Sequence, residues 1–371
     1  MLSVLSPSGC FRASDTQYPC VCARLGACGS EGRRLSSNQK AYRAVSAVEE
    51  AELGDEQADE DPTTLELCDH VADLLGKEKA LFLPSGTMCN QIALAIHCRP
   101  GDEIIAEETA HIINFEVGGA AVLANAMIWP VKGTNGLFAP DQLEAALRPA
   151  FRHAPKSRLV SVEQTSNLGG GSVWPLEQLK SISGFARDHQ LLVHMDGARL
   201  MNAVVASGVS AKAYGAQVDT VWIDLSKGLG CPIGGVLAGP AAFIQEAWQW
   251  KQRLGGSMRQ SGIIAAAGLY AFKHNVTRLK EDHDNAKFLA HRLADIPGLE
   301  IDPARVETNI ILLRVTSDKM TAHQVADTLA AQGIRIGAMT DRAVRLVTHL
   351  DVDRRGVTEA GDAIAEVLTG S

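Results

Sequence analysis

The sequence predicts an α/β fold, in which helices cover both faces of a mainly parallel sheet and a smaller C-terminal α/β domain follows. Three observations lead to this prediction. Strand-like and helix-like segments alternate along most of the chain, the strand-like segments are almost continuously apolar, and the pattern changes after a long helical stretch at 260–294. A chain of 371 residues is long enough for two domains.

The predicted elements follow in order along the chain. Residues 47–53 suggest a helix, and an acidic turn leads to Asp61-Pro62-Thr63, which starts the next helix with proline in its first turn. An apolar strand at 80–83 then breaks at Pro84-Ser85-Gly86, before apolar residues recur at helical spacing over 87–98. The further strands of the large domain are expected at 103–108, 126–132, 158–164, 191–196, 220–225 and 234–239, with helices at 175–189 and 239–254.

The last third of the chain has a different pattern. Strand-like segments at 301–315, 334–339 and 343–350 alternate with a helix at 321–333 and a final helix, which suggests an antiparallel sheet. We therefore expect a large domain over residues 47–255. Residues 256–371 are expected to form linking helices and the small C-terminal domain.

Residues 1–46 differ in composition from the rest. They hold five Arg, one Lys, only two acidic residues and eight Ser, with no clear period. The segment is consistent with an irregular N-terminal arm, with an organellar targeting sequence or with an upstream start that adds non-native residues.

Composition excludes several classes of protein. A net charge of −8 argues against nucleic acid or an anionic membrane as the main partner, and no apolar stretch is long enough to span a bilayer. The eight cysteines fit no standard zinc spacing, so we expect no metal. A chain of this size does not need disulfides, which favours a reducing, cytoplasmic location.

A lone lysine follows the apolar strand at 220–225. Small residues surround this Lys227, among them Gly228 and Gly230. An isolated lysine of this kind is usually a solvated turn residue. The alternative is a lysine that forms a Schiff base with a carbonyl compound.

Three other features lie where strands end or helices begin. Ser85, Gly86 and Thr87 lie at a strand-to-helix turn, where free N–H groups suit a phosphate. Asp196 ends a buried strand and could hold a protonated ring nitrogen, and Arg259 in a Gly-rich turn suits a phosphate. Singly these read as a helix cap, an Asp turn and a solvated arginine, but with Lys227 they match the needs of pyridoxal 5'-phosphate.

The motifs also resemble a known family. The segments "LFLPSGTMCNQIAL", "AHIINFEVGGAA", "VEQTSNLGGG", "HMDGARLMNA", "SKGLGCPIGG", "GGSMRQSGIIAAAGLYA" and "VRLVTHLDV" occur in the order typical of the L-threonine aldolase / aromatic amino acid β-eliminating lyase family. This resemblance covers most of the chain from about Gly54. It implies a fold-type-I pyridoxal-phosphate enzyme with a seven-stranded, mainly parallel sheet.

The resemblance implies roles for particular residues. Lys227 would carry the cofactor as a Schiff base, Asp196 would pair with its ring nitrogen, and His111 would stack on the ring and take part in proton movement. His153 matches a second histidine near the substrate and is the alternative to His111 as the catalytic group beside the β-hydroxyl proton. Arg199 and Arg345 would clamp the substrate carboxylate. The implied cofactor-binding residues are Ser85, Gly86, Thr87, His111, Asp196, Arg199, Lys227 and Arg259, and the last of these could act from a neighbouring subunit.

The sequence departs from the family pattern at three places. The usual "RSDT" motif has no clean counterpart, so the serine expected at the substrate carboxylate is either Ser14 or Ser37, and we favour Ser37. Ala58 stands where a tyrosine is frequent, and Ser166 where a histidine is frequent. These changes leave the preferred substrate side chain open.

The activity implied is retro-aldol cleavage of L-threonine or L-allo-threonine to glycine and an aldehyde, as part of amino acid metabolism. The alternatives are phenylserine cleavage, β-elimination or racemisation on the same scaffold, and a non-catalytic binding protein. A nucleotide-binding dehydrogenase is disfavoured because no G-x-G-x-x-G follows the first strand. The family also implies a cytoplasmic homo-oligomer, a dimer or tetramer, with active sites at the subunit interface.

Overall fold

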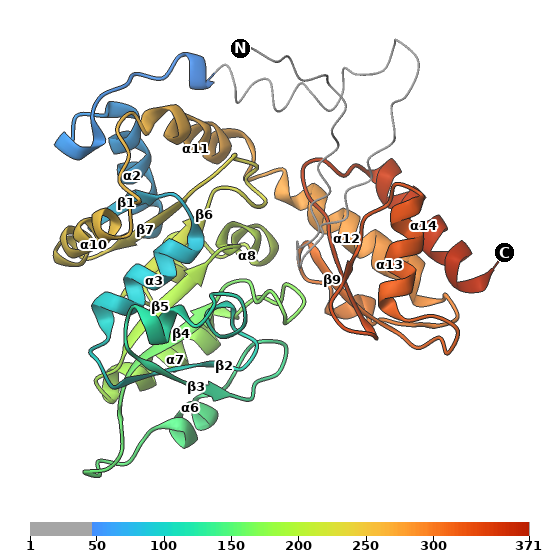
Figure 1. Cartoon of the computed structure of the whole chain (residues 1–371), viewed down its shortest axis with the longest axis horizontal. Helices are drawn as coiled ribbons and strands as arrows, with labels where there is room; N and C mark the ends of the chain where they lie inside the picture. Colours follow the sequence, from blue (N-terminus) through green and yellow to red (C-terminus); the bar gives the residue numbers. More distant parts are fainter. Residues whose placement is uncertain (1–46, 371) are drawn as a thin grey trace, which may run out of the picture.

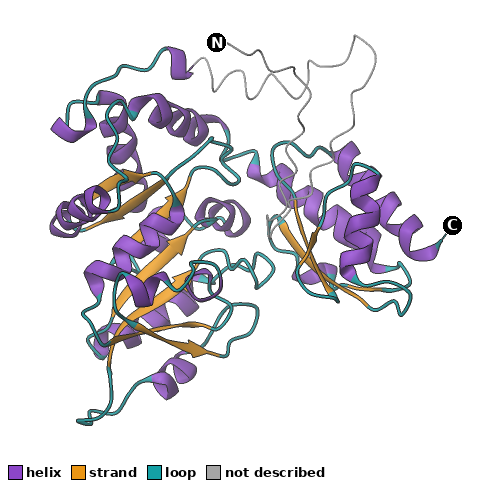
Figure 2. Cartoon of the chain, viewed as in Figure 1, coloured by secondary structure: helices purple, strands orange, loops and turns teal. Residues whose placement is uncertain are grey.

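The large domain is built on a seven-stranded sheet. The structure is a computed structural model that describes residues 47–370. Figure 1 shows the sheet on one side of the molecule, and Figure 2 shows the helices packed around its strands. The strands run in the order β1-β7-β6-β5-β4-β2-β3, with bounds β1 (Lys79–Leu83), β2 (Asp102–Glu107), β3 (Met127–Val131), β4 (Lys156–Glu163), β5 (Leu192–Gly197), β6 (Thr220–Asp224) and β7 (Gly235–Gly239).

The sheet is mainly parallel. Strands β2 to β6 pair in parallel, whereas β7 pairs antiparallel with both β1 and β6. The predicted fold class is therefore confirmed, including the seven strands and the helical cover. Parallel strands place their carboxyl ends along one edge of a sheet, which is where ligands bind in such folds.

Helices cover both faces because the strands are apolar on both. On one face, Val160 and Val193 pack in the main core with helices such as α7 (Leu176–Asp188) and α11 (Gly262–His274). On the other face, Trp222 packs with α3 (Gly86–His97) and α10 (Ala241–Arg253). The other helices of this part are α2 (Pro62–Leu75), α4 (His111–Asn114), α5 (Gly119–Val122), α6 (Pro140–Ala146), α8 (Leu200–Ser207), α9 (Ala211–Gly215) and the 3₁₀ turn η1 (Glu56–Ala58).

A four-stranded antiparallel sheet forms the small C-terminal part. Its strands run in the order β10-β11-β9-β8, with bounds β8 (Leu299–Glu300), β9 (Ile310–Val315), β10 (Gly337–Ala338) and β11 (Ala343–Val347). Together with the helices α12 (Leu279–Ala294), α13 (Ala322–Ala331) and α14 (Arg354–Thr369), they enclose a second core. The predicted antiparallel sheet is confirmed. The division at residue 255 stays a prediction. Helix α11 packs with the large sheet, and α12 packs with the small one except for Leu279 at its start, which belongs to the core of the large domain.

Some local predictions were wrong at their edges. Of residues 47–53 only 47–49 are helical, and the strand expected at 334–339 shrinks to β10. The segment 301–315 holds a 3₁₀ turn, η2 (Pro303–Arg305), before β9. Asp61 does begin α2, because its Oδ1 accepts a hydrogen bond from Thr64 N at 2.9 Å.

Within residues 47–370, no helix has both the length and the apolar composition needed to cross a bilayer.

Candidate active site

A cavity of about 640 Å³ lies at the carboxyl ends of the parallel strands. Loops after β1, β2, β4, β5 and β6 line it, and β11 of the small sheet contributes one side chain. The structure brings together eight of the residues that the sequence singled out: Ser85, Gly86, Thr87, His111, Asp196, Arg199, Lys227 and Arg345. Residues far apart in sequence meet here because the parallel strands end at one edge.

One end of the cavity is the start of α3. Ser85 is the N-cap of this helix, and its Oγ accepts a hydrogen bond from Met88 N at 3.2 Å. A side chain on Gly86 would overlap the indole of Trp222, so only glycine lets the helix begin this close to the sheet. The first N–H groups of a helix have no partner within it and carry partial positive charge, so this turn fits a phosphate.

Asp196 is held at the tip of β5. Its Oδ1 accepts a hydrogen bond from Ala198 N at 3.0 Å, and its Oδ2 accepts one from Asn90 Nδ2 at 2.8 Å. The residue is buried but lines the cavity. Two fixed donors therefore set the orientation of this carboxylate.

Lys227 reaches the cavity from the turn after β6. Its Nζ lies 2.8 Å from Asp224 Oδ2, and its side chain keeps 33% of its exposure. Asp224 Oδ1 accepts hydrogen bonds from Ser226 N at 2.6 Å and Ser226 Oγ at 2.7 Å. Burial raises the pKa of Asp224, but the charge of Lys227 and these hydrogen bonds lower it more, so the net shift is downward. Asp224 is thus a fixed anion that holds the amine at the cavity.

His111 begins α4 and faces a buried carboxylate. Its Nδ1 lies 2.9 Å from Glu116 Oε1, and its backbone N donates to Glu163 Oε2 at 2.9 Å. Burial lowers the pKa of His111, but the hydrogen bond to Glu116 and the charges of Asp196, Glu116 and Glu163 raise it more, so the net shift is upward.

Glu163 lies at the tip of β4, in register with Asp196. Burial, together with the nearby charge of Asp196, raises its pKa to about 7. Its Oε1 accepts a hydrogen bond from Asn167 N at 2.8 Å, and Asn167 Oδ1 accepts one from Arg345 Nη1 at 2.5 Å. Glu163 therefore joins the loop of His111 to the loop that contacts Arg345.

The chain is similar to proteins of one family over most of its length. Residues 37–317 match the beta-eliminating lyase family. The chain belongs to this family. The low specificity L-threonine aldolase of Escherichia coli K12 is 42% identical over 316 residues, which cover 85% of this chain and 92% of that protein. The family predicted from the motifs is confirmed.

Two further relatives extend the comparison. The probable low-specificity L-threonine aldolase 2 of Arabidopsis thaliana is 38% identical over 309 residues, which cover 82% of this chain and 87% of that protein. The crystal structure of a putative L-allo-threonine aldolase from Listeria monocytogenes superposes with a TM-score of 0.74 at 22% identity, and the match covers 95% of this chain and 96% of that one. At this identity the structural match shows a shared fold.

Two residues that the family resemblance implied do not line the cavity of their own chain. Arg259 pairs with Asp55 at 2.6 Å and its side chain is 62% exposed. His153 lies in an exposed loop and packs edge-on against Phe151, with 5.0 Å between ring centroids. His153 does not reach this cavity because it precedes β4, at the amino end of the strand, whereas the cavity lies at the carboxyl end. At about 3.3 Å per residue, the two ends of β4 are about 25 Å apart.

The remaining predicted positions are placed elsewhere. Ser37 and its alternative Ser14 lie outside the described residues. Ala58 ends η1. Ser166 is buried, with its Oγ accepting a hydrogen bond from Gly169 N at 3.2 Å, and it does not line the cavity.

Sequence reasoning missed several polar residues of this site: Asn90, Glu116, Glu163, Asn167 and Asp224. The signal for two of them was present, because Glu163 and Asp224 end apolar strands in the way that selected Asp196. Asn90 interrupts an apolar helix face, which indicates a buried polar partner. Glu116 had no signal of its own, since a short irregular segment brings it under α3.

Proposed function

We propose that this member of the family is a pyridoxal-phosphate-dependent aldehyde-lyase. It cleaves L-threonine and L-allo-threonine between Cα and Cβ, giving glycine and acetaldehyde. The observation that carries the proposal is the meeting of Asp196 and Lys227, from neighbouring strand ends, with Arg345 in one cavity. The names and high coverage of the relatives support the same activity.

The residues of the cavity fit this cofactor. The first turn of α3, from Ser85 to Thr87, would hold its phosphate, Asp196 would hold the ring nitrogen, and Lys227 would bind it covalently. When bound, pyridoxal phosphate supplies an electron sink for the pair released at Cα. A Cβ on Gly86 would fall on the ring of Trp222, so the turn that would receive the phosphate requires glycine at this position.

The substrate carboxylate would be bound by arginine. Arg199 and Arg345 both line the cavity, and a guanidinium can donate two parallel hydrogen bonds to a carboxylate. Asn167 fixes Arg345 in place through the 2.5 Å hydrogen bond to Nη1. This arrangement selects an α-amino acid over an amine.

His111 would accept the proton of the substrate's β-hydroxyl. In the neutral ring, a hydrogen bond from Nδ1–H to Glu116 leaves Nε2 as the basic nitrogen. The raised pKa of His111 increases its strength as a base near neutral pH.

We further propose a cytoplasmic homo-oligomer with active sites at subunit interfaces. Arg259 is exposed, and in this proposal it reaches the phosphate of a second copy. His153, exposed on its loop, is likewise available to another chain. Ser37 would complete the carboxylate site from the N-terminal arm.

A product assay tests the proposal. Purified protein is incubated with pyridoxal phosphate and L-threonine, L-allo-threonine, L-phenylserine, L-serine or L-alanine. We expect acetaldehyde and glycine in equal amounts from both threonine isomers. Pyruvate from L-serine, or D-alanine from L-alanine, without acetaldehyde would establish the elimination or racemase alternative. A bound cofactor with no turnover of any substrate would indicate a binding protein.

A further inference from the structure

A chain of hydrogen bonds runs between α3 and the sheet and ends on Asp196. His97 Nε2 lies 2.7 Å from Thr220 Oγ1, which lies 2.8 Å from His194 Nδ1. His194 Nε2 lies 3.1 Å from Asn90 Oδ1, and Asn90 Nδ2 donates to Asp196 at 2.8 Å. All five residues are buried, and the proposed mechanism uses only the last.

The fold brings these residues together by simple periodicity. On the parallel pair β5 and β6, His194 is opposite Thr220 and Asp196 is opposite Trp222. Residues two apart on a strand share a face, so all four side chains belong to the face covered by α3. On α3, Asn90 and His97 are two turns apart and therefore also share a face. The helix that carries the phosphate turn is thus fixed to the strand that carries Asp196.

Trp222 identifies the oxygen of the Asn90 amide. Its indole Nε1, which can only donate, lies 2.7 Å from Asn90 Oδ1, so that atom must be the amide oxygen. The amide nitrogen then faces two carboxylates, Asp196 at 2.8 Å and Glu116 at 2.7 Å. Both of its hydrogens are used.

The same donor and acceptor count determines which ring nitrogen carries the hydrogen in each of the two histidines. Because Asn90 Oδ1 is an acceptor, His194 Nε2 carries the hydrogen and Nδ1 accepts from the Thr220 hydroxyl. Thr220 has one proton, so its oxygen accepts from His97 Nε2–H. Burial lowers the pKa of His194 to about 3 and that of His97 to about 4, so each ring is neutral and has one N–H.

We propose that Asn90, fixed by Trp222 and by the His194–Thr220–His97 chain, is a positioning residue that presents a donor, never an acceptor, to Asp196. This inference rests on the proposed function, because it gives Asp196 the cofactor ring nitrogen as its partner. The titratable groups around Asp196 are Glu116, Glu163, His111 and the buried thiol of Cys89. With two other carboxylates this close, a flipped amide would add a further acceptor beside Asp196 and displace it.

The test compares two substitutions of His194 in the holoenzyme. His194→Phe removes the donor to Asn90, whereas the Nε2 of Gln in His194→Gln can replace it. His194→Phe leaves Trp222 as the single donor to the Asn90 oxygen, so the amide can rotate and its hydrogen bond to the Asp196 carboxylate weakens. We expect about a tenfold higher cofactor dissociation constant and about a tenfold lower kcat, with KM unchanged, as for loss of a hydrogen bond to a charged group. His194→Gln should stay within about twofold of the wild type. The visible absorbance of the bound cofactor, followed against pH, should shift only in His194→Phe.

His283→Phe is the matched control. His283 is equally a buried histidine bonded to an asparagine, Asn202 at 3.1 Å, but it lies outside the cavity. The His283→Phe variant should have a lower midpoint of thermal unfolding and an unchanged cofactor affinity. Thr220→Val removes the hydroxyl donor to His194 Nδ1 and should give a smaller shift in the same direction as His194→Phe. It takes the place of His194→Phe if that variant does not fold.

Two outcomes would overturn the inference. One is equal cofactor affinity, kcat and absorbance profile in His194→Phe, Thr220→Val and the wild type. The other is an effect of His283→Phe as large as that of His194→Phe. Failure of the wild type to cleave any amino acid would refute the proposed function, while cofactor affinity and the absorbance profile would still decide the role of Asn90.

Discussion

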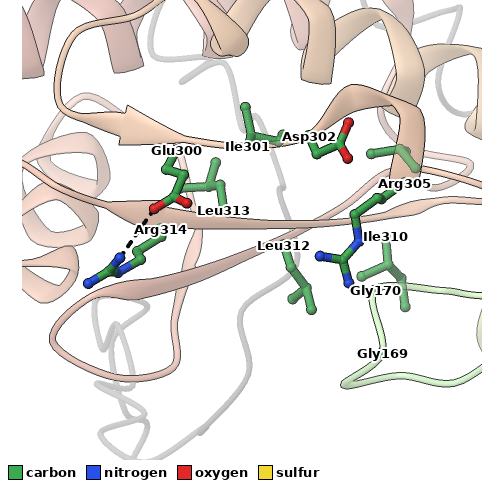
Figure 3. A pocket seen from close by; sticks show the side chains of 11 residues that line it. Gly169, Gly170, Glu300, Ile301, Asp302, Arg305, Ile310, Leu312, Leu313 and Arg314 are labelled. Atoms are coloured by element: carbon green, nitrogen blue, oxygen red, sulfur yellow. Dashed lines mark hydrogen bonds and ion pairs between the residues drawn. The ribbon is translucent and has the colours of Figure 1, made fainter. Parts of the chain in front are cut away.

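The cavity of the candidate active site and a second cleft in this protein differ in what they can bind, although both are large. The cavity at the carboxyl ends of the parallel strands has a volume of about 640 Å³, and the cleft beside β8 and β9 has about 460 Å³. Figure 3 shows that the cleft brings Gly169 and Gly170 opposite the small sheet and that Glu300 and Arg314 on its wall pair with each other.

The difference lies in the burial of the charges. In the cleft, Glu300 and Arg314 are opposite on an antiparallel pair and both are more than half exposed. In the cavity, Asp196, Glu163 and Asp224 are buried, and each is held by donors from a different loop. Buried charges are costly unless they are paired, so their convergence marks a site, whereas volume alone does not.

Substitution of Lys227, the lysine of the cavity, should have the largest effect on activity. Lys227→Ala should remove the cofactor linkage that borohydride reduces and lower kcat by at least about a thousandfold. Lys79→Ala, at an exposed lysine, should retain both the reducible cofactor linkage and the wild-type kcat. Reductive labelling of another lysine in the Lys227 variant, seen by peptide mass spectrometry, would refute the assignment.

Removal of the charge of Asp196 should have the next largest effect. Asp196→Asn should lower kcat by about a hundredfold, as loss of a buried charge aimed at the reacting group does. The control is Asp302→Asn in the cleft, where we expect unchanged kinetics. Steady-state rates of both variants decide the matter, and equal rates would take Asp196 out of the mechanism.

Arg345→Lys should act on the substrate more than on the cofactor. A lysine offers one point charge in place of a planar fork, so KM for the amino acid should rise about tenfold or more, or about 1.4 kcal/mol. Cofactor affinity should hardly change. Arg305→Lys in the cleft is the control, and an unchanged KM in Arg345→Lys would contradict its role.

The pH profile should report His111. Since the base must be unprotonated, kcat/KM should fall as the pH decreases through the raised pKa of His111. Glu116→Gln removes a charge that raises this pKa, so the acidic limb should move to lower pH. A limb that stays in place in Glu116→Gln would assign it to another group.

A substitution in the cleft should have the smallest effect on stability and activity. Arg314→Ala breaks an exposed ion pair and should change the free energy of unfolding by about 0–1 kcal/mol. Aldehyde production should be unchanged. A large loss of activity would show that the cleft is functional and would contradict the distinction drawn between the cavity and the cleft.

Much of this protein could be predicted from the sequence. Apolar strands that alternate with helices predicted the covered parallel sheet, and the change of pattern near residue 294 predicted the second, antiparallel sheet. Residue chemistry at strand ends selected Asp196 and Lys227, which do line one cavity. These predictions succeeded because period, polarity and strand ends are local properties of the chain.

The sequence alone determined the fold class, the family and the strand ends that carry the candidate chemistry, but only the tertiary structure decided which polar residues meet. Asn90 and Asp196 are 106 positions apart, and the register of β5 and β6 under α3 brings them within hydrogen-bond distance. His153, by contrast, is excluded from its own chain's cavity because it lies at the amino end of a strand whose carboxyl end forms the site. The physical reason is that contacts depend on strand direction and register, which involve the whole sheet, whereas a motif records only its neighbours in sequence.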